Sequence, residues 1–425
     1  MNLTKEQQEI YDGKQGATLA KVMQTLVRYG ELFGADGMVP VTSKYNHLVT
    51  SFGLKALAPV YELMNQLIES GNVSKQKFSA DPRPLDPNVP SSFLQDFVFK
   101  NFMYSKQDDY EKQLTQLGIM EKDAYTCTCY MDEVGNTPAM GEVLSWSESS
   151  AVVYANSVLG ARCNRNSGII DLMGSVVGYV PRFGLLTDEG RKATWIVKIE
   201  TTKKPEAQLL GSAIGMKVMA DVPYIVGLDK WLGGELDDAK TYLKDFGAAT
   251  ASNGAVGLYH VENITPEAVK YGKDLITEDA KVYVVDDAEL QRVYESYPVI
   301  WKKKDAKPKL CFMGCPHMSL QQLIDWTEKV SQSLKEAGRT RVCIPTVFTA
   351  APAVLKKFQE TPYAETLKAT GVITSYICPL MYMNNPLSEK MPVITSSNKL
   401  RTYTSARYYT DAEILEQITK GGADR

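Results

Sequence analysis

The chain has 425 residues, and its 47 Lys and Arg residues nearly balance its 50 Asp and Glu residues, leaving a formal net charge of −3 at pH 7. It lacks the basic excess typical of nucleic-acid-binding proteins, so no nucleic-acid partner is expected. With 44% hydrophobic and 23% charged residues the composition is that of a globular protein, and no apolar run approaches the roughly 18–20 residues that a membrane span requires.

The first ten residues, MNLTKEQQEI, are polar where a secretory signal would be basic and then apolar, which predicts a cytoplasmic protein. In a reducing compartment the seven cysteines are expected to be thiols or metal ligands rather than disulfides. The length allows two or three compact units, or one large α/β assembly.

Residues 1–190 are predicted to be mostly helical. Thr4 and Gln7 form a capping-box pattern before a first helix, and the apolar spacing in residues 17–34 predicts a second. A similar pattern in residues 54–70 predicts a third helix.

Three other segments of this part have a distinct character. MVPVTS (38–43) is predicted to be a short strand, and the four prolines of residues 79–92 predict an irregular connection that could carry function. Residues 139–160 are rich in small side chains and are expected to contain a closely packed, buried helix.

From residue 191 to 425 apolar strands alternate with helices, a pattern that predicts parallel sheets covered by helices and an α/β fold. The predicted strands are ATWIVKIE, VPYIVGL, AVGLYHV, KVYVVD, KLCFMG, RVCIPTV, GVITSYI and MPVITSS. Helices are predicted between them, including 319–337, which Ser319 should cap, and 352–369.

Two cysteines follow predicted strands directly: Cys315 comes after KLCFMG and Cys378 after VITSYI. Both thiols should therefore lie at the carboxyl ends of neighbouring parallel strands, where open α/β sheets bind ligands. The helix that Ser319 caps would place free backbone N–H groups near Cys315. The alternative is that each cysteine is a small buried hydrophobe.

Cys127, in the segment TCTCY together with Cys129, is a third candidate. Three thiolates from distant parts of a chain are the minimum set that holds a cubic iron–sulfur cluster while leaving one iron open to substrate. The spacing does not indicate zinc, because there are no paired C-x-x-C motifs. Cys311 and Cys343 lie inside predicted apolar strands and are expected to be core residues.

The segment from Glu148 to Gly168 brings further polar groups around one helix and the turn after it. Glu148 and Ser149 begin this segment, and Arg162, Asn164 and Arg165 follow the helix. Arginines there could bind a carboxylate or phosphate, although they could equally cap the last carbonyls of the helix.

Each of the three histidines, His47, His260 and His317, could be a core or surface residue. His317 lies two residues after a candidate ligand and is the strongest catalytic candidate among them.

Seven segments together resemble the aconitase X family, specifically its large, catalytic subunit, and they span nearly the whole chain. They are YGELFGADGMVPVTS, CTCYMDEVGNTPAMGE, SESSAVVYANSVLGAR, FGAATASNGAVGLYHVENITPEA, FMGCPHMSLQQL, ICPLMYMNNP and ITSSNKLRTY. The resemblance implies an aconitase-like fold with several α/β subdomains around a central cleft. It also implies a hydro-lyase with an iron–sulfur cluster, of a type the sequence leaves open, held by Cys127, Cys315 and Cys378.

The chain departs from the family pattern at four points. Cys163 stands where the family usually has Thr, Cys129 where it has Pro, and Asn166 where it has an acidic residue. His47 lies in KYNHL rather than in a serine-rich turn. The loss of the acidic residue bears on substrate identity, and the two additional thiols bear on cluster type.

The resemblance also implies roles for other residues and for a partner. Arg162, Asn164, Arg165 and the loop with Ser396, Ser397 and Lys399 would anchor the substrate, while Glu148, Ser149 and His317 would be catalytic. Only about 25 residues follow ITSSNKL, too few for the small swivelling domain of the family. We therefore expect that domain to be a separate small subunit, and we expect the chain alone to be nearly inactive.

Three hypotheses for function follow. The first is dehydration of a small hydroxy acid, with cis-3-hydroxy-L-proline as the preferred substrate. The second is the large subunit of a mevalonate 5-phosphate dehydratase, and the third is a divergent binding or assembly subunit without turnover. The proton-accepting base is not assigned.

Overall fold

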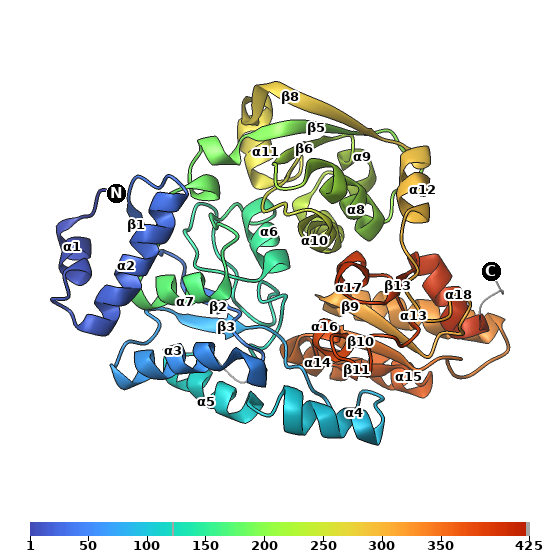
Figure 1. Cartoon of the computed structure of the whole chain (residues 1–425). Coiled ribbons are helices and arrows are strands. Elements are labelled where there is room, and N and C mark those ends of the chain that lie inside the picture. Colours follow the sequence, from blue (N-terminus) through green and yellow to red (C-terminus); the bar gives the residue numbers. More distant parts are fainter. Residues whose placement is uncertain (121–122, 422–425) are drawn as a thin grey trace.

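The computed structural model describes residues 1–120 and 123–421. Figure 1 shows a blue N-terminal part on the left, a green-to-yellow sheet at the top and an orange-to-red sheet at the lower right. Each of these regions has its own buried apolar core. The α/β fold predicted from the sequence, with parallel sheets covered by helices, is confirmed.

The N-terminal region is built mostly from helices with two small strand pairs. Its helices are α1 (Lys5–Tyr11), α2 (Ala17–Leu32), η1 (Lys55–Leu57), α3 (Ala58–Glu69), α4 (Phe93–Val98), the π-helix η2 (Phe99–Met103), α5 (Gln107–Leu117), α6 (Ser149–Ser157), α7 (Gly168–Val177), η3 (Gly184–Leu186) and η4 (Glu189–Arg191). Its strands are β1 (Met38–Pro40), β2 (Tyr45–Leu48), β3 (Lys77–Ala80) and β4 (Tyr179–Pro181).

Local sequence signals set several of these elements. Thr4 and Gln7 form the predicted capping box of α1. β1 pairs antiparallel with β4, and β2 pairs parallel with β3, so the segments that follow β2 and β3 leave the pair on the same side. The proline-rich segment 81–92 has no helix or strand, as expected. Helix α6 is almost fully buried, which agrees with its small side chains.

The middle region contains a four-stranded parallel sheet in the order β7-β6-β5-β8. Its strands are β5 (Ala193–Ile199), β6 (Pro223–Val226), β7 (His260–Val261) and β8 (Ile276–Val285). Its helices are α8 (Ala207–Val218), α9 (Asp229–Leu232), α10 (Leu236–Asn253), α11 (Pro266–Tyr271), η5 (Gly272–Leu275) and α12 (Asp287–Glu295). Helix α10 packs against both α8 and α6 and so links this region to the N-terminal one.

The C-terminal region is a five-stranded parallel sheet in the order β11-β10-β9-β12-β13. Its strands are β9 (Leu310–Met318), β10 (Thr346–Ala350), β11 (Ile373–Ser375), β12 (Val393–Thr395) and β13 (Arg407–Tyr408). Its helices are α13 (Leu320–Glu336), α14 (Pro352–Gln359), α15 (Tyr363–Ala369), α16 (Pro379–Met383), α17 (Asn398–Tyr403) and α18 (Asp411–Lys420). Ser319 caps α13 as predicted, and it does so through a capping box with Gln322.

Some expectations for this sheet were wrong in detail. Cys315 lies inside β9 rather than after it, and β9 and β11 are separated by β10 rather than adjacent. The strand predicted at RVCIPTV begins only at Thr346, so Cys343 is exposed outside the sheet and is not a core residue. The helix predicted over 352–369 is divided into α14 and α15.

Within the described residues, no helix has the length and apolar character needed to cross a membrane.

Candidate active site

A cavity of about 860 Å³ lies where the three regions meet. Cys315 in β9, Cys378 after β11 and Asp81 after β3 all line it, so it lies toward the carboxyl ends of these strands. Its polar lining comes from Asp81, Cys127, Ser147, Glu148, Ser149, Arg165, Asn166, Cys315, His317, Cys378, Asn384, Lys399 and Tyr403.

The three predicted ligand cysteines come together in this cavity although they span most of the chain. Each thiol has a polar neighbour: the N–H of His317 donates to Cys127 Sγ at 3.4 Å, Ser397 lies against Cys315, and the N–H of Met381 lies against Cys378. The pKa of each of the three thiols is raised by burial, that of Cys378 to about 12. The Lys399 ammonium offsets only part of this rise.

This arrangement fits an iron–sulfur cluster better than a single metal ion. Among residues 1–120 and 123–421, no three His, Cys, Asp or Glu side chains are close enough together to enclose one ion. A cluster is wider, because each cysteine binds a different iron, and hydrogen bonds to the ligand sulfurs are a usual feature of such sites. Metal binding would also supply the positive charge that three buried thiolates need.

His317 joins the three cysteine-bearing segments and has no free ring nitrogen. Its Nε2–H donates to the Ile377 carbonyl at 3.0 Å, and its Nδ1 is 3.0 Å from Thr126 Oγ1. Burial lowers the pKa of His317 to about 4, so the ring is neutral at pH 7. His317 lines the cavity, but both of its ring nitrogens are hydrogen-bonded, so this geometry favours a structural role beside Cys127 and Cys378 over the catalytic role predicted from the sequence.

Glu148 and Lys399 form a buried ion pair in the cavity wall. The other carboxylate oxygen of Glu148 accepts from the Ala151 N–H at 2.7 Å and from Ser150 Oγ at 2.6 Å, so Glu148 also caps α6. Burial opposes ionisation of Glu148, but Lys399 outweighs it and lowers the pKa of Glu148. Glu148 thus stays ionised and fully bonded, and Lys399 is the group it holds in place.

Asp81 and His47 form a second buried pair of opposite charge, which sequence reasoning did not find. Asp81 Oδ1 lies 3.4 Å from His47 Nε2, and His47 Nδ1 lies 2.9 Å from Ser79 Oγ. Burial raises the pKa of Asp81. Burial alone would lower the pKa of His47, but Cys129 and Asp81 outweigh it and raise that pKa to about 10. The parallel register of β2 and β3 brings the pair together, pairing His47 with Ser79.

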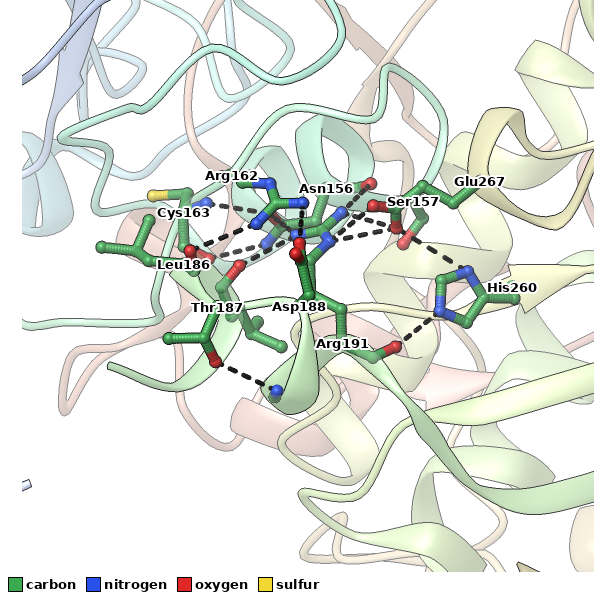
Figure 2. Close-up of polar contacts among 12 residues, drawn as sticks. Asn156, Ser157, Arg162, Cys163, Leu186, Thr187, Asp188, Arg191, His260 and Glu267 are labelled. Carbon is green, nitrogen blue, oxygen red and sulfur yellow. Dashed lines mark hydrogen bonds and ion pairs between the residues drawn. The ribbon is translucent and has the colours of Figure 1, made fainter. Parts of the chain in front are cut away.

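Arg165 lines the cavity, as predicted, but its two predicted companions do not. The Arg162 guanidinium pairs with Asp188 and donates to the Leu186 carbonyl, as Figure 2 shows. The Asn164 amide donates to the Phe183 carbonyl and accepts from the Leu185 N–H. Both side chains therefore bind the segment 183–188, and the prediction that they line the cavity is wrong. Arg165 has no carboxylate partner within the described residues and only one long bond, 3.4 Å to the Ala251 carbonyl.

The serines divide in a similar way. Ser149, at the start of α6, lines the cavity. Ser396 and Ser397 instead line a separate small pocket on the other side of Cys315, so their prediction as residues of the main cavity is corrected. Ser397 caps α17, which begins one residue before Lys399. Its hydroxyl also donates to the Cys315 carbonyl.

The remaining cysteines lie outside the cavity lining. Cys129 is buried beside His47, and Cys163 is buried with its Sγ near the Trp146 and Asn164 carbonyls. Cys311 is a core residue of β9, as expected.

Comparisons with known proteins agree with this geometry. The aconitase X first domain matches residues 1–189, and the aconitase X second domain matches residues 193–295. The phosphomevalonate dehydratase large subunit of Thermococcus kodakarensis is 32% identical over 87% of this chain and 86% of its own length. The chain belongs to the aconitase X family.

Other relatives of this aconitase X chain support the same assignment. The phosphomevalonate dehydratase large subunit of Methanocaldococcus jannaschii is 28% identical over 99% of this chain and all of its own length. The cis-3-hydroxy-L-proline dehydratase of Hypocrea jecorina is 26% identical over 76% of this chain but only 52% of its own length. The crystal structure of Thermococcus kodakaraensis aconitase X in its holo-form superposes with a TM-score of 0.78 at 28% identity, covering 98% of this chain and 100% of that one. This aconitase X chain is accordingly a dehydratase, a hydro-lyase.

Proposed function

We propose that this chain is the large, catalytic subunit of an iron–sulfur dehydratase whose substrate is mevalonate 5-phosphate. The observation that carries the proposal is one buried cavity lined by three thiols, an unpaired arginine and a carboxylate of raised pKa. The choice of substrate rests on relatives matched over 86% or more of their own length, which are phosphomevalonate dehydratase large subunits. Their names also support a small partner subunit for this chain.

Arg165 is proposed to bind the anionic group of the substrate. Burial lowers its pKa, and the nearby Tyr403 hydroxyl and Glu148 carboxylate offset this only in part, because neither forms an ion pair or hydrogen bond with the guanidinium. A substrate carboxylate or phosphate would supply that missing charge through a paired hydrogen bond. Lys399 lies in the same wall but is already neutralised by Glu148, so it would orient the substrate rather than bind a full negative charge.

Asp81 is proposed as the base. Elimination of water from a β-hydroxy acid requires a carboxylate or imidazole that accepts the proton from the carbon between the hydroxyl-bearing carbon and the carboxylate. Asp81 faces the cavity, and burial raises its pKa, which makes its carboxylate a stronger base than an exposed one. His47 lies 3.4 Å from Asp81, and its raised pKa keeps it protonated at neutral pH, so it would hold the Asp81 carboxylate in position rather than accept the proton itself.

Cys127, Cys315 and Cys378 are proposed to hold the cluster. When bound there, it would supply the Lewis acid that weakens the bond between carbon and the departing hydroxyl. His317 keeps the three segments in register, and Ser149 lines the same cavity, where it can contact the hydroxyl or the released water.

Cis-3-hydroxy-L-proline, the substrate preferred from the sequence alone, becomes the second candidate. It is also a β-hydroxy acid, and it carries one carboxylate and no phosphate. Arg165 is the one cation of the cavity wall without a carboxylate partner among the described residues, and one such cation suffices for one carboxylate. The cis-3-hydroxy-L-proline dehydratases in the comparison are matched over only 52% and 42% of their own lengths, which favours the first candidate.

The test is a parallel assay of both substrates. The chain is purified under anaerobic conditions, alone and mixed with the candidate small subunit, and water elimination is followed by the ultraviolet absorbance of the new double bond. Turnover of mevalonate 5-phosphate on mixing, with little turnover of cis-3-hydroxy-L-proline, supports the proposal. The opposite preference overturns the substrate assignment. A cluster-containing complex that dehydrates neither would favour the binding or assembly subunit.

A further inference from the structure

A buried polar network lies behind the cavity, around the end of α6 (Figure 2). Arg191, only 1% exposed, uses all five of its N–H groups within it. They donate to the Glu267 carboxylate at 2.8 Å, to the Asn156 carbonyl at 3.0 Å, to Asn156 Oδ1 at 3.2 Å and to the Leu185 carbonyl at 3.1 Å. His260 Nε2–H donates to the Arg191 carbonyl at 2.8 Å. A guanidinium so fully bonded cannot bind substrate, so its role is to hold its neighbours.

Asn156 connects this hydrogen-bond network to the loop that carries Arg165. Its amide Nδ2 donates to the Cys163 and Gly257 carbonyls, both at 2.8 Å, while its Oδ1 accepts from the Cys163 N–H at 2.9 Å. The Asn156 side chain thus hydrogen-bonds to both the N–H and the carbonyl of Cys163 and links this backbone to that of Gly257. Because Arg191 donates to the same Oδ1, the orientation of the amide is determined by the network.

The residues on either side of Arg165 are pinned as well. Asn164 is bonded to Phe183 and Leu185, and Asn166 accepts from Tyr29 Oη at 3.0 Å and donates to Asp171 at 3.1 Å. Arg165 is the exception in this loop, because its guanidinium has no side-chain partner within the described residues. Its backbone is thus fixed on both sides, while its side chain lines the cavity that holds the three cysteines.

Gly257 supplies the surface over which the Arg165 side chain runs. A Cβ built on Gly257 would lie 3.1 Å from Arg165 Cδ and 3.2 Å from Arg165 Cγ, closer than ordinary van der Waals contact. It would also lie 2.8 Å from Leu185 Cδ1, the end of a flexible chain that can rotate away. The Arg165 atoms lie in the middle of its chain, so any shift there moves the guanidinium.

We propose that Asn156 and Gly257 are positioning residues that aim Arg165 into the cavity, with Arg191 and Glu267 as their support. This inference rests on the proposed function of Arg165 in binding the anionic end of the substrate. It predicts that residues without substrate contact control the KM for that substrate, while the cluster and the base are unaffected.

Gly257→Ala is the main test, in the complex of this chain with its small subunit. We expect the KM for the preferred substrate to rise about tenfold, because misplacing the guanidinium weakens hydrogen bonds to a charged group, with kcat within about threefold and visible cluster absorbance unchanged. Gly247→Ala is the matched control: its Cβ would lie 3.2 Å from Val153 and Tyr259 in the core, with no Arg165 atom among its nearest neighbours, and KM should stay within twofold. Asn156→Asp, which keeps the size but loses both N–H donors, should raise KM like Gly257→Ala.

A double-mutant cycle separates positioning from a general loss of stability. Adding Gly257→Ala to an Arg165→Ala variant should raise KM no further, because the group being positioned is already gone. If Arg165→Ala raises KM but Gly257→Ala and Asn156→Asp do not, the positioning proposal is overturned and the proposed role of Arg165 stands. If Arg165→Ala itself leaves KM unchanged, the binding role fails first, and the positioning proposal fails with it. If Asn156→Asp does not fold, Gly257→Ala still decides the question.

Discussion

Replacing His317 by Phe tests whether the hydrogen bonds of this residue hold the three cysteine-bearing segments together. The ring keeps its approximate shape but loses both hydrogen bonds, each 3.0 Å long, to Thr126 Oγ1 and the Ile377 carbonyl. Thr126 keeps Thr128 as a partner, whereas the Ile377 carbonyl loses the contact with His317. A buried group without a partner costs about 1–3 kcal/mol, so we expect a local destabilisation of about 2–4 kcal/mol in total.

The assay is native-state hydrogen exchange, because a chain with several regions does not unfold in one step. Amides of residues 126–128 and 376–378 should exchange about 30-fold faster or more in His317→Phe, which corresponds to a loss of about 2 kcal/mol. His260→Phe is the control, since His260 is another buried histidine bonded to a backbone carbonyl but belongs to the Arg191 network. Exchange rates within threefold of those of the parent chain at both segments would refute this structural role of His317.

Three other predictions concern single groups. Asp81→Asn should lower kcat by about 10²–10⁴ without loss of the cluster, and turnover close to that of the parent would exclude Asp81 as the base. Glu148→Gln leaves Lys399 buried without its counter-charge and should destabilise the chain by about 3–5 kcal/mol, while Glu148→Gln combined with Lys399→Met should recover most of that loss; thermal unfolding measures both. Burial, and to a lesser extent Asp411, raise the pKa of Glu206 to about 7. The folded chain therefore keeps a proton that the unfolded chain loses above pH 4.5. The contribution of Glu206 to the free energy of unfolding should fall by roughly 3 kcal/mol between pH 4.5 and 7. Glu206→Gln should make that decline shallower, since the buried Asp81, Asp171 and Asp411 carboxyls still contribute to it, and an unchanged pH profile would contradict the prediction.

Much of the fold follows from local signals in the sequence. The Thr4 capping box and the Ser319 cap mark helix starts correctly. The apolar strands that alternate with helices after residue 190 predict parallel sheets, and the structure has two of them in that part. The errors fall where tertiary contacts override local pattern. RVCIPTV is apolar enough for a strand, but Cys343 bonds instead to the backbone of α18, and only the part from Thr346 joins the sheet.

The site was predicted unevenly for a physical reason. Cysteines after strands can be recognised because parallel strand ends meet at one edge, and the thiols do line one cavity. The sequence cannot distinguish the roles of Arg162 and Arg165. Asp188, which pairs with Arg162 and so keeps it out of the cavity, comes from another segment of the chain. Asp81 lies in a proline-rich loop with no motif of its own, and only the pairing of β2 with β3 brings it to His47.

The ligand set is the claim on which the account depends, and iron content after anaerobic reconstitution tests it most directly. Cys127→Ser, Cys315→Ser and Cys378→Ser should each lose iron and visible absorbance relative to the parent chain. Cys163→Ser and Cys311→Ser, at buried thiols outside the cavity, should keep both. Full iron content in any of the first three variants, or its loss in Cys163→Ser, would contradict the cluster site described above.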